Sequence, residues 1–364
     1  MNRCLLLVLA ALVACVDDPS SPAVPMDVTA SAANRGRSLD RADGGITVMS
    51  QNLYVGADVD LVIGALASPD PRDDFPALLF AIETLGKTDF PARAAAIADE
   101  IARRRPHAVG LQEVSLINID LTGFGVPIVV RLDFLTILRA ELAGRGLNYS
   151  VAATVQNIAA VPVPGISLVD FDALLVDAGR VTVTAAGGRN FTANVGPVAP
   201  GVALIRGWVW ARTTVAGRPT TFVSTHAEAD LGGAQLSDLR ALQIGELIGT
   251  VTSDARVVLM GDLNDTPGSP MYEVLKRAGF TDVWAALQSG ERGNTCCHVA
   301  DLSNPVAALA KRIDYVFTRG WGGRRDDLSG EIARFGDVPA DRVTGPAYPI
   351  WPSDHAGLVA TLQR

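Results

Sequence analysis

Residues 256–265, RVVLMGDLND, join an apolar run to a string of polar side chains. Residues 256–260 fit a buried strand, because two valines, a leucine and a methionine follow Arg256 without a further charge among them. The carboxylate of Asp262 and the amide of Asn264 then follow directly. Loops at strand ends commonly carry binding and catalytic groups, so we expect chemistry at this junction.

Polar residues end or follow apolar segments at five further places. Taken singly, each has an ordinary explanation: Glu113 could cap a helix, and a pair such as Asp354-His355 often lies on the surface. The set is more informative, because the chain has only 4 His and two of them, His226 and His355, fall in these strings. Buried charge is costly unless it pairs or binds a metal. The strings are Ser50-Gln51-Asn52-Leu53, Leu111-Gln112-Glu113-Val114, Ser224-Thr225-His226, Arg312-Ile313-Asp314-Tyr315 and Ser353-Asp354-His355.

Hydrophobic periodicity predicts strands and helices in irregular succession. This mixture favours an α+β fold with two packed mixed sheets flanked by helices over a doubly wound parallel sheet. Short β-branched segments within residues 149–223 predict hairpins. The predicted strands are residues 46–52, 108–113, 172–176, 180–184, 202–211, 220–224, 256–260, 312–317 and 357–362, and the predicted helices are residues 94–105, 130–144 and 234–249 with one starting near Ser269.

The six polar strings resemble the motifs of the endonuclease/exonuclease/phosphatase superfamily. That family's pattern is an Asn after the first strand, a Gln-Glu after the second, then Thr-His, Gly-Asp-Xaa-Asn, Arg-Xaa-Asp-Tyr and a terminal Ser-Asp-His. All six occur here in family order between Asn52 and His355. The resemblance implies the DNase I-like fold, a four-layer α/β sandwich, and a divalent-metal-dependent phosphoesterase.

The resemblance also assigns ligands for the metal. Hydrolysis of a phosphate ester needs a cation to neutralise the non-bridging oxygens and an oriented water. Mg²⁺ prefers hard oxygen ligands, so carboxylates and an amide suit it, and Mn²⁺ is the alternative. Glu113 and Asn52 are the expected metal ligands, with Asp354 as a further contributor.

The resemblance assigns the remaining groups to catalysis. His355 suits a general base near neutral pH, and it needs a partner such as Asp314 to fix its tautomer. Asp262 and Asn264 are expected to orient the water and hold a phosphate oxygen, with a second metal position as an alternative. His226 corresponds to the family's second imidazole, which contacts the phosphate or assists the leaving group.

The charge balance bears on the substrate. The formal net charge is −8, and no basic face is visible in the sequence. Proteins that grip long nucleic acids usually carry such a face. We therefore expect small or lipid-borne phosphate esters, with a secreted DNase I-like endonuclease and a non-catalytic surface-binding lipoprotein as the alternatives. We also expect a monomer.

The N-terminus resembles a bacterial lipoprotein signal. Residues 5–13 form an apolar run too short to span a bilayer, and Leu12-Val13-Ala14-Cys15 resembles a lipobox. We expect residues 1–14 to be a signal peptide, 15–44 a flexible tether, and 45–364 the catalytic domain. The protein would then be exported and held in the bacterial cell envelope by lipid on Cys15, or else simply secreted.

Three further features have open roles. Cys296 and Cys297 are neighbours, so they favour a structural bridge or, as an alternative, redox sensing, and without a nearby His pair they make a poor zinc site. Asp58 is either a helix cap or a peripheral ligand. His298 is expected to be a solvated loop histidine, although it could approach the substrate.

Overall fold

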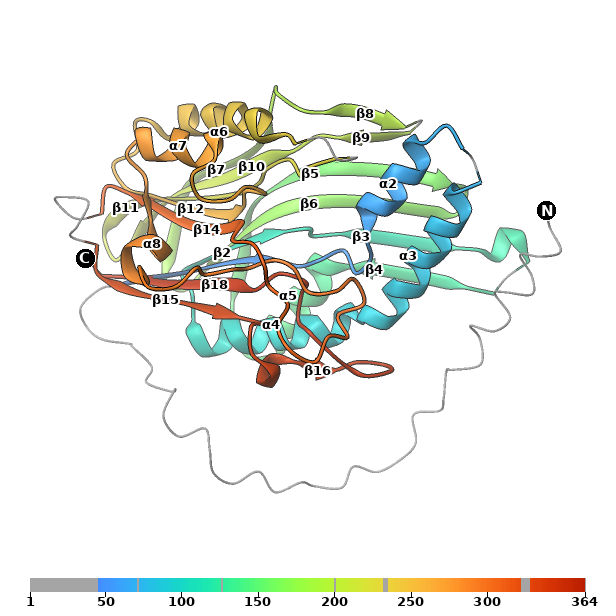
Figure 1. Cartoon of the computed structure of the whole chain (residues 1–364). Helices are drawn as coiled ribbons and strands as arrows, with labels where there is room; N and C mark the ends of the chain where they lie inside the picture. Colours follow the sequence, from blue (N-terminus) through green and yellow to red (C-terminus); the bar gives the residue numbers. More distant parts are fainter. Residues whose placement is uncertain are drawn as a thin grey trace, which may run out of the picture.

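The computed structural model describes residues 45–363, apart from 71, 126, 200, 232–234 and 322–327. The expected signal peptide, the whole of the expected tether and Cys15, the expected site of lipid attachment, therefore lie outside the described residues. Within them the chain forms two large β-sheets packed face to face, with helices on both outer faces (Figure 1). The predicted four-layer α+β sandwich is confirmed.

The first sheet is mixed, and it contains β1 (Ile46–Asn52), the first strand of the described chain. Strand β1 pairs parallel with β2 on one side and antiparallel with β18 on the other. Strands β3 and β4 extend β6 as a side branch. In spatial order the main path is β15 (Gly330–Phe335), β18 (Gly357–Leu362), β1 (Ile46–Asn52), β2 (Ala108–Gln112), β6 (Ile166–Asp177), β5 (Tyr149–Val163), β9 (Val202–Leu204) and β8 (Gly196–Ala199), with β3 (Leu116–Asp120) and β4 (Val129–Asp133) off this path.

The second sheet is also mixed. Strands β11 and β12 run parallel, whereas β12 and β14 run antiparallel. Its order is β13 (Thr281–Asp282), β14 (Asp314–Arg319), β12 (Val257–Asp262), β11 (Arg218–His226), β10 (Gly207–Val215) and β7 (Val181–Asn190). A separate small hairpin pairs β16 (Val343–Thr344) with β17 (Pro349–Ile350).

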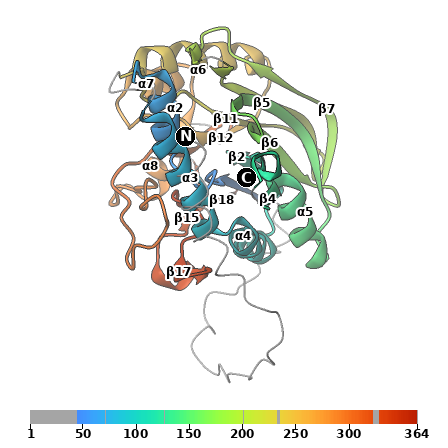
Figure 2. The same ribbon diagram turned by 90° about the vertical axis from the view of Figure 1, so that its right-hand side faces the viewer.

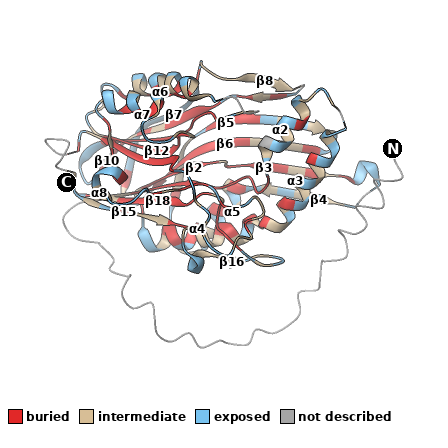
Figure 3. Cartoon of the chain, in the orientation of Figure 1, coloured by how far each residue is buried: buried red, intermediate tan, exposed pale blue. Residues whose placement is uncertain are grey.

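Alternation along each strand builds three apolar layers. In β12, Val258 and Met260 enter the core between the two sheets, while Val257 and Leu259 face the helices outside. In β1, Val48 faces the core between the sheets and Met49 faces the opposite way. The central strands are consequently buried on both faces, as Figure 3 shows.

Two helix pairs cover the outer faces. Helices α4 (Phe90–Arg104) and α5 (Phe134–Gly144) pack on the first sheet, where the rings of Phe90 and Phe134 stack at 3.5 Å. Helices α6 (Ser237–Val251) and α7 (Pro270–Arg277) pack on the second. Figure 2 shows these pairs at opposite ends of the stack. Among the described residues, no helix has the length and apolar character that a membrane span requires.

Two helices that the periodicity did not predict follow β1. They are α2 (Val59–Ala67) and α3 (Asp74–Thr88), which lie at one end of the sheets (Figures 1 and 2). The Asp58 carboxylate caps α2 by accepting a hydrogen bond of 2.9 Å from Leu61 N. The cap interpretation of Asp58 is thus confirmed. A short helix, α8 (Val283–Leu287), and two 3₁₀ turns, η2 (Thr122–Phe124) and η4 (Pro339–Asp341), complete the regular elements.

Other boundaries differ from the predictions. The predicted helix 130–144 begins only at Phe134, because residues 129–133 form edge strand β4 beside β3. The predicted strand 202–211 is two strands in different sheets, β9 and β10, separated at Ile205 and Arg206. Strand β14 starts at Asp314 rather than at Arg312. Helix α7 does begin after Ser269, whose hydroxyl accepts from Tyr272 N.

The strand registers bring the polar strings to one edge. The parallel strands β1 and β2 end together, at Asn52 and Gln112, and β11 and β12 end together, at His226 and Asp262. Because β14 and β18 run antiparallel to their neighbours, their beginnings lie at the same edge: Asp314 pairs with Asp262. Every predicted site residue therefore lies on one edge of the sandwich or in the loops that follow it.

Candidate active site

A cavity of about 330 Å³ lies at this edge, between the two sheets and beside α2. Two predicted site residues, Asn52 and Asp314, are buried behind the cavity wall and hydrogen bond to residues in it. The other predicted residues line it directly: Glu113, His226, Asp262, Asn264, Asp354 and His355. The structure thus brings together all eight side chains, which come from six separate regions of the chain.

The close approach of the sheets depends on a small residue. A Cβ at Gly110 would lie 2.8 Å from Ser224 Oγ in the facing sheet. The missing side chain leaves room for Gln112, whose Nε2 donates to the same hydroxyl at 2.9 Å. Gln112, the neighbour of Glu113 in the sequence motif, therefore links the sheets behind the cavity and does not line it.

Glu113 lines the cavity, and Asn52 holds it from behind. Asn52 Nδ2 donates to Glu113 Oε1 at 2.9 Å and to Asp262 Oδ2 at 3.2 Å. Tyr54 N donates to Asn52 Oδ1, and Val55 N donates to Glu113 Oε2, both at 2.8 Å. Glu113 has a φ of 55°, in the left-handed region that non-glycine residues seldom adopt. Such strained backbone is common at functional sites, where the surrounding structure holds it.

Asp354 adds a second carboxylate beside Glu113. It is half-buried and lines the cavity. Burial and the negative charge of Glu113 raise the pKa of Asp354 to about 7, against the opposing effect of the His355 imidazole. A bound cation favours the ionised form of such an acid, because it supplies a positive charge beside the carboxylate.

Asp262 and Asn264 form the centre of the site. Asn264, with a φ of 51°, donates its backbone N–H to Asp262 Oδ1 at 2.9 Å. Burial and the neighbouring Asp314 raise the pKa of Asp262 to about 7. The Asn264 side-chain nitrogen also lies 3.1 Å from Ala227 O, which holds the amide across the end of β11.

His355 and Asp314 form a histidine–carboxylate pair. His355 Nδ1 lies 2.8 Å from Asp314 Oδ2 and 3.8 Å from Asp262 Oδ2. Although burial disfavours the charged ring, the carboxylates of Asp314, Asp354 and Asp262 raise the pKa of His355 well above its usual range. Asp314 itself is held by Thr295, whose Oγ1 accepts the Asp314 backbone N–H at 3.1 Å.

His226 belongs to a second network that includes a residue without a predicted site role. Arg206 Nη1 lies 3.1 Å from His226 Nδ1, and Arg206 Nε donates to Glu228 at 3.2 Å. A guanidinium has no acceptor, so Nδ1 must accept and the proton of the neutral ring sits on Nε2. Burial and the Arg206 cation hold the pKa of His226 well below its usual range. The ring is therefore neutral, and its Nε2–H lies 3.5 Å from Asp262 Oδ2.

Two buried acids next to this network also had no predicted role. Asp170 lies on β6 at the cavity, where it accepts from Ser115 Oγ at 3.2 Å and Asn157 Nδ2 at 3.4 Å. Burial and the nearby Glu113 raise the pKa of Asp170 to about 7. Asp172, two residues along the same strand, is also buried, and burial and Asp170 raise its pKa well above the usual range. Two acids at alternating positions in an otherwise apolar strand are the sequence signal that could have pointed to these residues.

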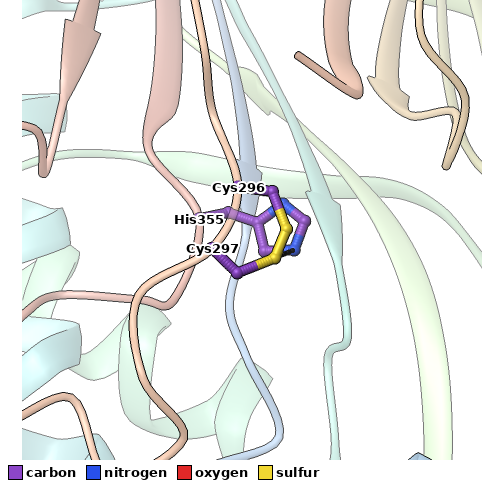
Figure 4. A group of neighbouring side chains, drawn as sticks. All are labelled: Cys296, Cys297 and His355. Carbon is purple, nitrogen blue, oxygen red and sulfur yellow. Dashed lines mark hydrogen bonds between the residues drawn. A yellow bond between two sulfur atoms is a disulfide. The ribbon is translucent and has the colours of Figure 1, made fainter. Parts of the chain in front are cut away.

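The cysteine pair and His298 also border the cavity. Cys296 and Cys297 form a disulfide, and Cys297 Sγ lies 3.9 Å from His355 Nε2 (Figure 4). The expectation that His298 is solvated is wrong. Its ring is 5% exposed, stacks on Trp351 at 4.1 Å and bonds through Nε2 to Gly336 O at 3.0 Å. These contacts give His298 a packing role in the cavity wall.

The described residues offer more than one group of metal-ligating atoms. Ligand atoms of Asp262, Asp314 and His355 lie within 4.8 Å of one another. However, His355 Nδ1 and Asp314 Oδ2 already bind each other. Glu113, Asn52 and Asp354 instead supply hard oxygen donors at the cavity, which is the chemistry that Mg²⁺ and Mn²⁺ require. This donor set fits a divalent cation better than the histidine-containing group.

Solved structures with the same fold include proteins from several sources. An endonuclease/exonuclease/phosphatase family protein from Bacteroides thetaiotaomicron is 14% identical over 87% of this chain and 94% of its own, with a TM-score of 0.54. The human Nocturnin catalytic domain with bound sulfate is 16% identical over 88% and 93%, with a TM-score of 0.53. D. rerio TDP2 complexed with single-strand DNA product is 15% identical over 88% and 100%, with a TM-score of 0.50.

At these identities the structural likeness establishes the fold alone. No curated protein matches the chain in sequence. The family model described as the Endonuclease/Exonuclease/phosphatase family matches residues 49–355. This span contains the eight predicted site residues from Asn52 to His355, and it reaches from β1 to the loop before β18. The chain therefore belongs to the endonuclease/exonuclease/phosphatase family.

Proposed function

We propose that this protein is a divalent-metal-dependent hydrolase of phosphoester bonds, acting as a phosphodiesterase on small or lipid-borne phosphate esters. One observation carries the proposal. His355, Glu113 and Asp354 line the same cavity, with Asp314 and Asn52 hydrogen-bonded directly behind them. The two groups lie on either side of Asp262. A base and a cation site that share one cavity are the two parts that phosphate ester hydrolysis needs.

In this mechanism His355 takes the proton of the attacking water. Asp314 accepts from Nδ1, so in the neutral ring the lone pair of Nε2 faces the cavity, and the carboxylate stabilises the imidazolium that forms. Asp262 and Asn264 lie beside the base and orient the water. On the other side, His226 Nε2–H is placed to donate to a phosphate or leaving-group oxygen, while Arg206 holds the ring in that tautomer.

Glu113, Asn52 and Asp354 would hold the metal. A bound divalent cation neutralises the non-bridging phosphate oxygens as charge develops there. The chain itself contributes the placement of these donors. Backbone N–H groups of Tyr54 and Val55 fix the side chains of Asn52 and Glu113, so the ligands are ordered before any ion arrives. Mg²⁺ and Mn²⁺ are the cations proposed.

The preference for lipid-borne esters rests on an apolar pocket next to the cavity. The pocket lies between α2, α3 and strands β3, β5 and β6, and every residue lining it except Ser167 is apolar. Six residues line both the pocket and the cavity, so the two spaces are neighbours: Val55, Ala57, Val59, Ile63, Ile158 and Leu168. An ester with its phosphate at the base could place an apolar chain there.

A metal-by-substrate activity matrix tests the proposal. Purified protein would be assayed with chelator, Mg²⁺, Mn²⁺ and Ca²⁺ against lipid head-group esters, soluble phosphodiesters and supercoiled plasmid. We expect metal-dependent release of the lipid head group to be fastest. Faster plasmid cleavage would instead favour the secreted endonuclease, and inactivity on every ester would favour the non-catalytic binding role.

The location of the protein is a separate part of the proposal. We propose export and lipid anchoring through Cys15, since the lipobox-like string precedes that residue. Expression of the full chain in a bacterial host with labelled palmitate tests this. Wild type should incorporate the label into the membrane fraction, whereas Cys15→Ser should not. Label in neither protein, with the wild type released to the medium, would favour simple secretion.

A further inference from the structure

The disulfide between Cys296 and Cys297 borders the nitrogen of His355 that the proposed mechanism uses. Cys297 is exposed, and its Sγ lies 3.9 Å from His355 Nε2. Cys296 is buried at 5% exposure and is paired with both Lys311 and His355 in isolated β-bridges. Figure 4 shows both sulfur atoms beside the imidazole ring. A reductant in solution can therefore reach a bond that adjoins the base.

The backbone around the cysteines is held without help from the disulfide. Cys296 N donates to Lys311 O at 3.0 Å, and Lys311 N donates to Cys296 O at 2.9 Å. On the other side Ala356 N donates to Thr295 O, and His298 N donates to Asp354 O, both at 2.8 Å. Opening the sulfur–sulfur bond would leave these contacts in place, so the two thiols would stay near His355.

The three side chains suit a soft cation. The two Sγ atoms and a ring nitrogen of His355 all lie within 4.8 Å of one another. Tetrahedral Zn²⁺ with Zn–S near 2.3 Å and Zn–N near 2.0 Å needs a sulfur–nitrogen separation of roughly 3.6 Å. The observed 3.9 Å is close to that. His355 also donates through Nδ1 to Asp314, the arrangement in which zinc-binding histidines are usually held.

We propose that reduction of the Cys296–Cys297 disulfide creates a Zn²⁺ site made of both sulfurs and His355 Nε2, and that zinc bound there blocks the base. A phosphine reductant breaks the sulfur–sulfur bond, takes oxygen from water to become the phosphine oxide, and leaves two thiols. Zinc binding then releases the two thiol protons to solvent. A water fills the fourth position. In the oxidised protein neither sulfur is a thiolate, so no such site exists and His355 stays free.

Cadmium titration tests the binding half of the proposal, because thiolate-bound Cd²⁺ has a charge-transfer absorbance in the near ultraviolet that oxygen ligands do not produce. The full chain would be reduced with a phosphine and titrated with Cd²⁺, and Zn²⁺ would then compete. Oxidised wild type and the Cys296→Ser/Cys297→Ser double variant are the controls. We expect the band in reduced wild type and in neither control.

His355→Ala tests the third ligand. Loss of even an outer-shell partner costs about 10- to 100-fold in metal affinity, so loss of a direct ligand should weaken Cd²⁺ binding at least that much while the band remains. No band in the reduced wild type would overturn the proposal. A band with unchanged affinity in His355→Ala would overturn the assignment of His355.

The consequence for catalysis is a separate measurement. Micromolar Zn²⁺ should abolish turnover by reduced wild type but leave the oxidised protein and the double serine variant active. Equal inhibition of all three would place the inhibitory zinc elsewhere and contradict the proposed block. The cadmium result does not depend on any substrate being found, so failure of the proposed function and failure of this inference can be told apart.

Discussion

His355 Nδ1 and Asp314 Oδ2 lie 2.8 Å apart, and this hydrogen bond determines which nitrogen of the imidazole faces the cavity. Both side chains are almost fully buried, so little water competes for the contact. The two residues are 41 positions apart in sequence. Asp314 begins β14 of the second sheet and His355 lies just before β18 of the first, so the packing of the two sheets brings them together. A short contact between distant elements thus decides whether the base is correctly oriented.

Replacing Asp314 with Asn should remove most of the activity without unfolding the protein. The amide can donate to Nδ1, which favours the wrong tautomer and no longer stabilises the imidazolium. A comparable change in a serine protease lowers kcat about 10⁴-fold, and we expect a loss of roughly 10³-fold or more in kcat. Asp254→Asn is the matched control, because Asp254 pairs with Arg212 away from the cavity. Equal loss in both variants would contradict a specific role for Asp314.

Glu113→Gln should weaken binding of the activating metal. Gln keeps the shape of the side chain but removes the charge that Mg²⁺ or Mn²⁺ needs. The metal concentration for half-maximal activity should rise at least roughly tenfold, as it does when metal-site partners are lost. Glu331→Gln on the exposed edge of the first sheet controls for loss of charge alone. Chelator should abolish wild-type turnover, and added metal should restore it. An unchanged metal dependence in Glu113→Gln would remove Glu113 from the ligand set.

Asp170 should make the stability of the fold depend on pH. Its pKa is about 7 in the folded protein, against an ordinary value of 3.8. Between these values the folded state holds a proton that the unfolded state has lost, so stability falls as pH rises through this range. Asp170→Asn has no carboxyl group at this position, so its stability lacks this dependence on pH. Each pKa unit corresponds to about 1.4 kcal/mol, so the variant should gain about 3 kcal/mol relative to wild type between pH 5 and pH 7.

Urea unfolding at several pH values measures this difference. The free energies of unfolding of Asp170→Asn and wild type should diverge steadily from pH 5 to pH 7 and then stay parallel. Glu331→Gln again serves as the control, since an exposed carboxylate should show no such divergence. A difference between Asp170→Asn and wild type that is constant with pH would contradict the raised pKa.

The convergence of the polar strings could be predicted from the sequence because each lies at the end of a strand or in the adjoining loop. Strands β1 and β18 were predicted with the correct bounds, since both are buried and bordered by polar residues. Strand β4 was predicted as part of a helix, because its five residues form an edge strand through pairing with β3, and no local pattern shows that pairing. The local sequence pattern is therefore insufficient where a strand forms only by pairing at the edge of a sheet.

The site residues without a predicted role have the same explanation. Arg206 belongs to none of the six polar strings, and its significance comes from contacts with His226 and Glu228, 20 and 22 residues later. Helices α2 and α3 were also missed. Their apolar faces line the pocket opposite strands β3, β5 and β6, yet the segment carries exposed Phe75 and Phe80 and several prolines that obscure its periodicity.

The apolar pocket gives the last prediction, which concerns the length of the substrate chain. Val62 on α2 is half-buried and lines the pocket without lining the cavity. Val62→Phe should fill part of the pocket and exclude about two methylene groups of a bound chain. At about 0.8 kcal/mol for each buried methylene, kcat/KM for long-chain esters should fall roughly 15-fold. Short-chain esters should be hydrolysed as by wild type, because the cavity itself is unchanged.

Leu61→Phe, on an exposed position of the same helix, is the matched control and should leave both substrates unaffected. Equal slowing of long and short esters by Val62→Phe would show that the pocket does not hold the substrate chain. That result would not bear on the role of His355 as the base.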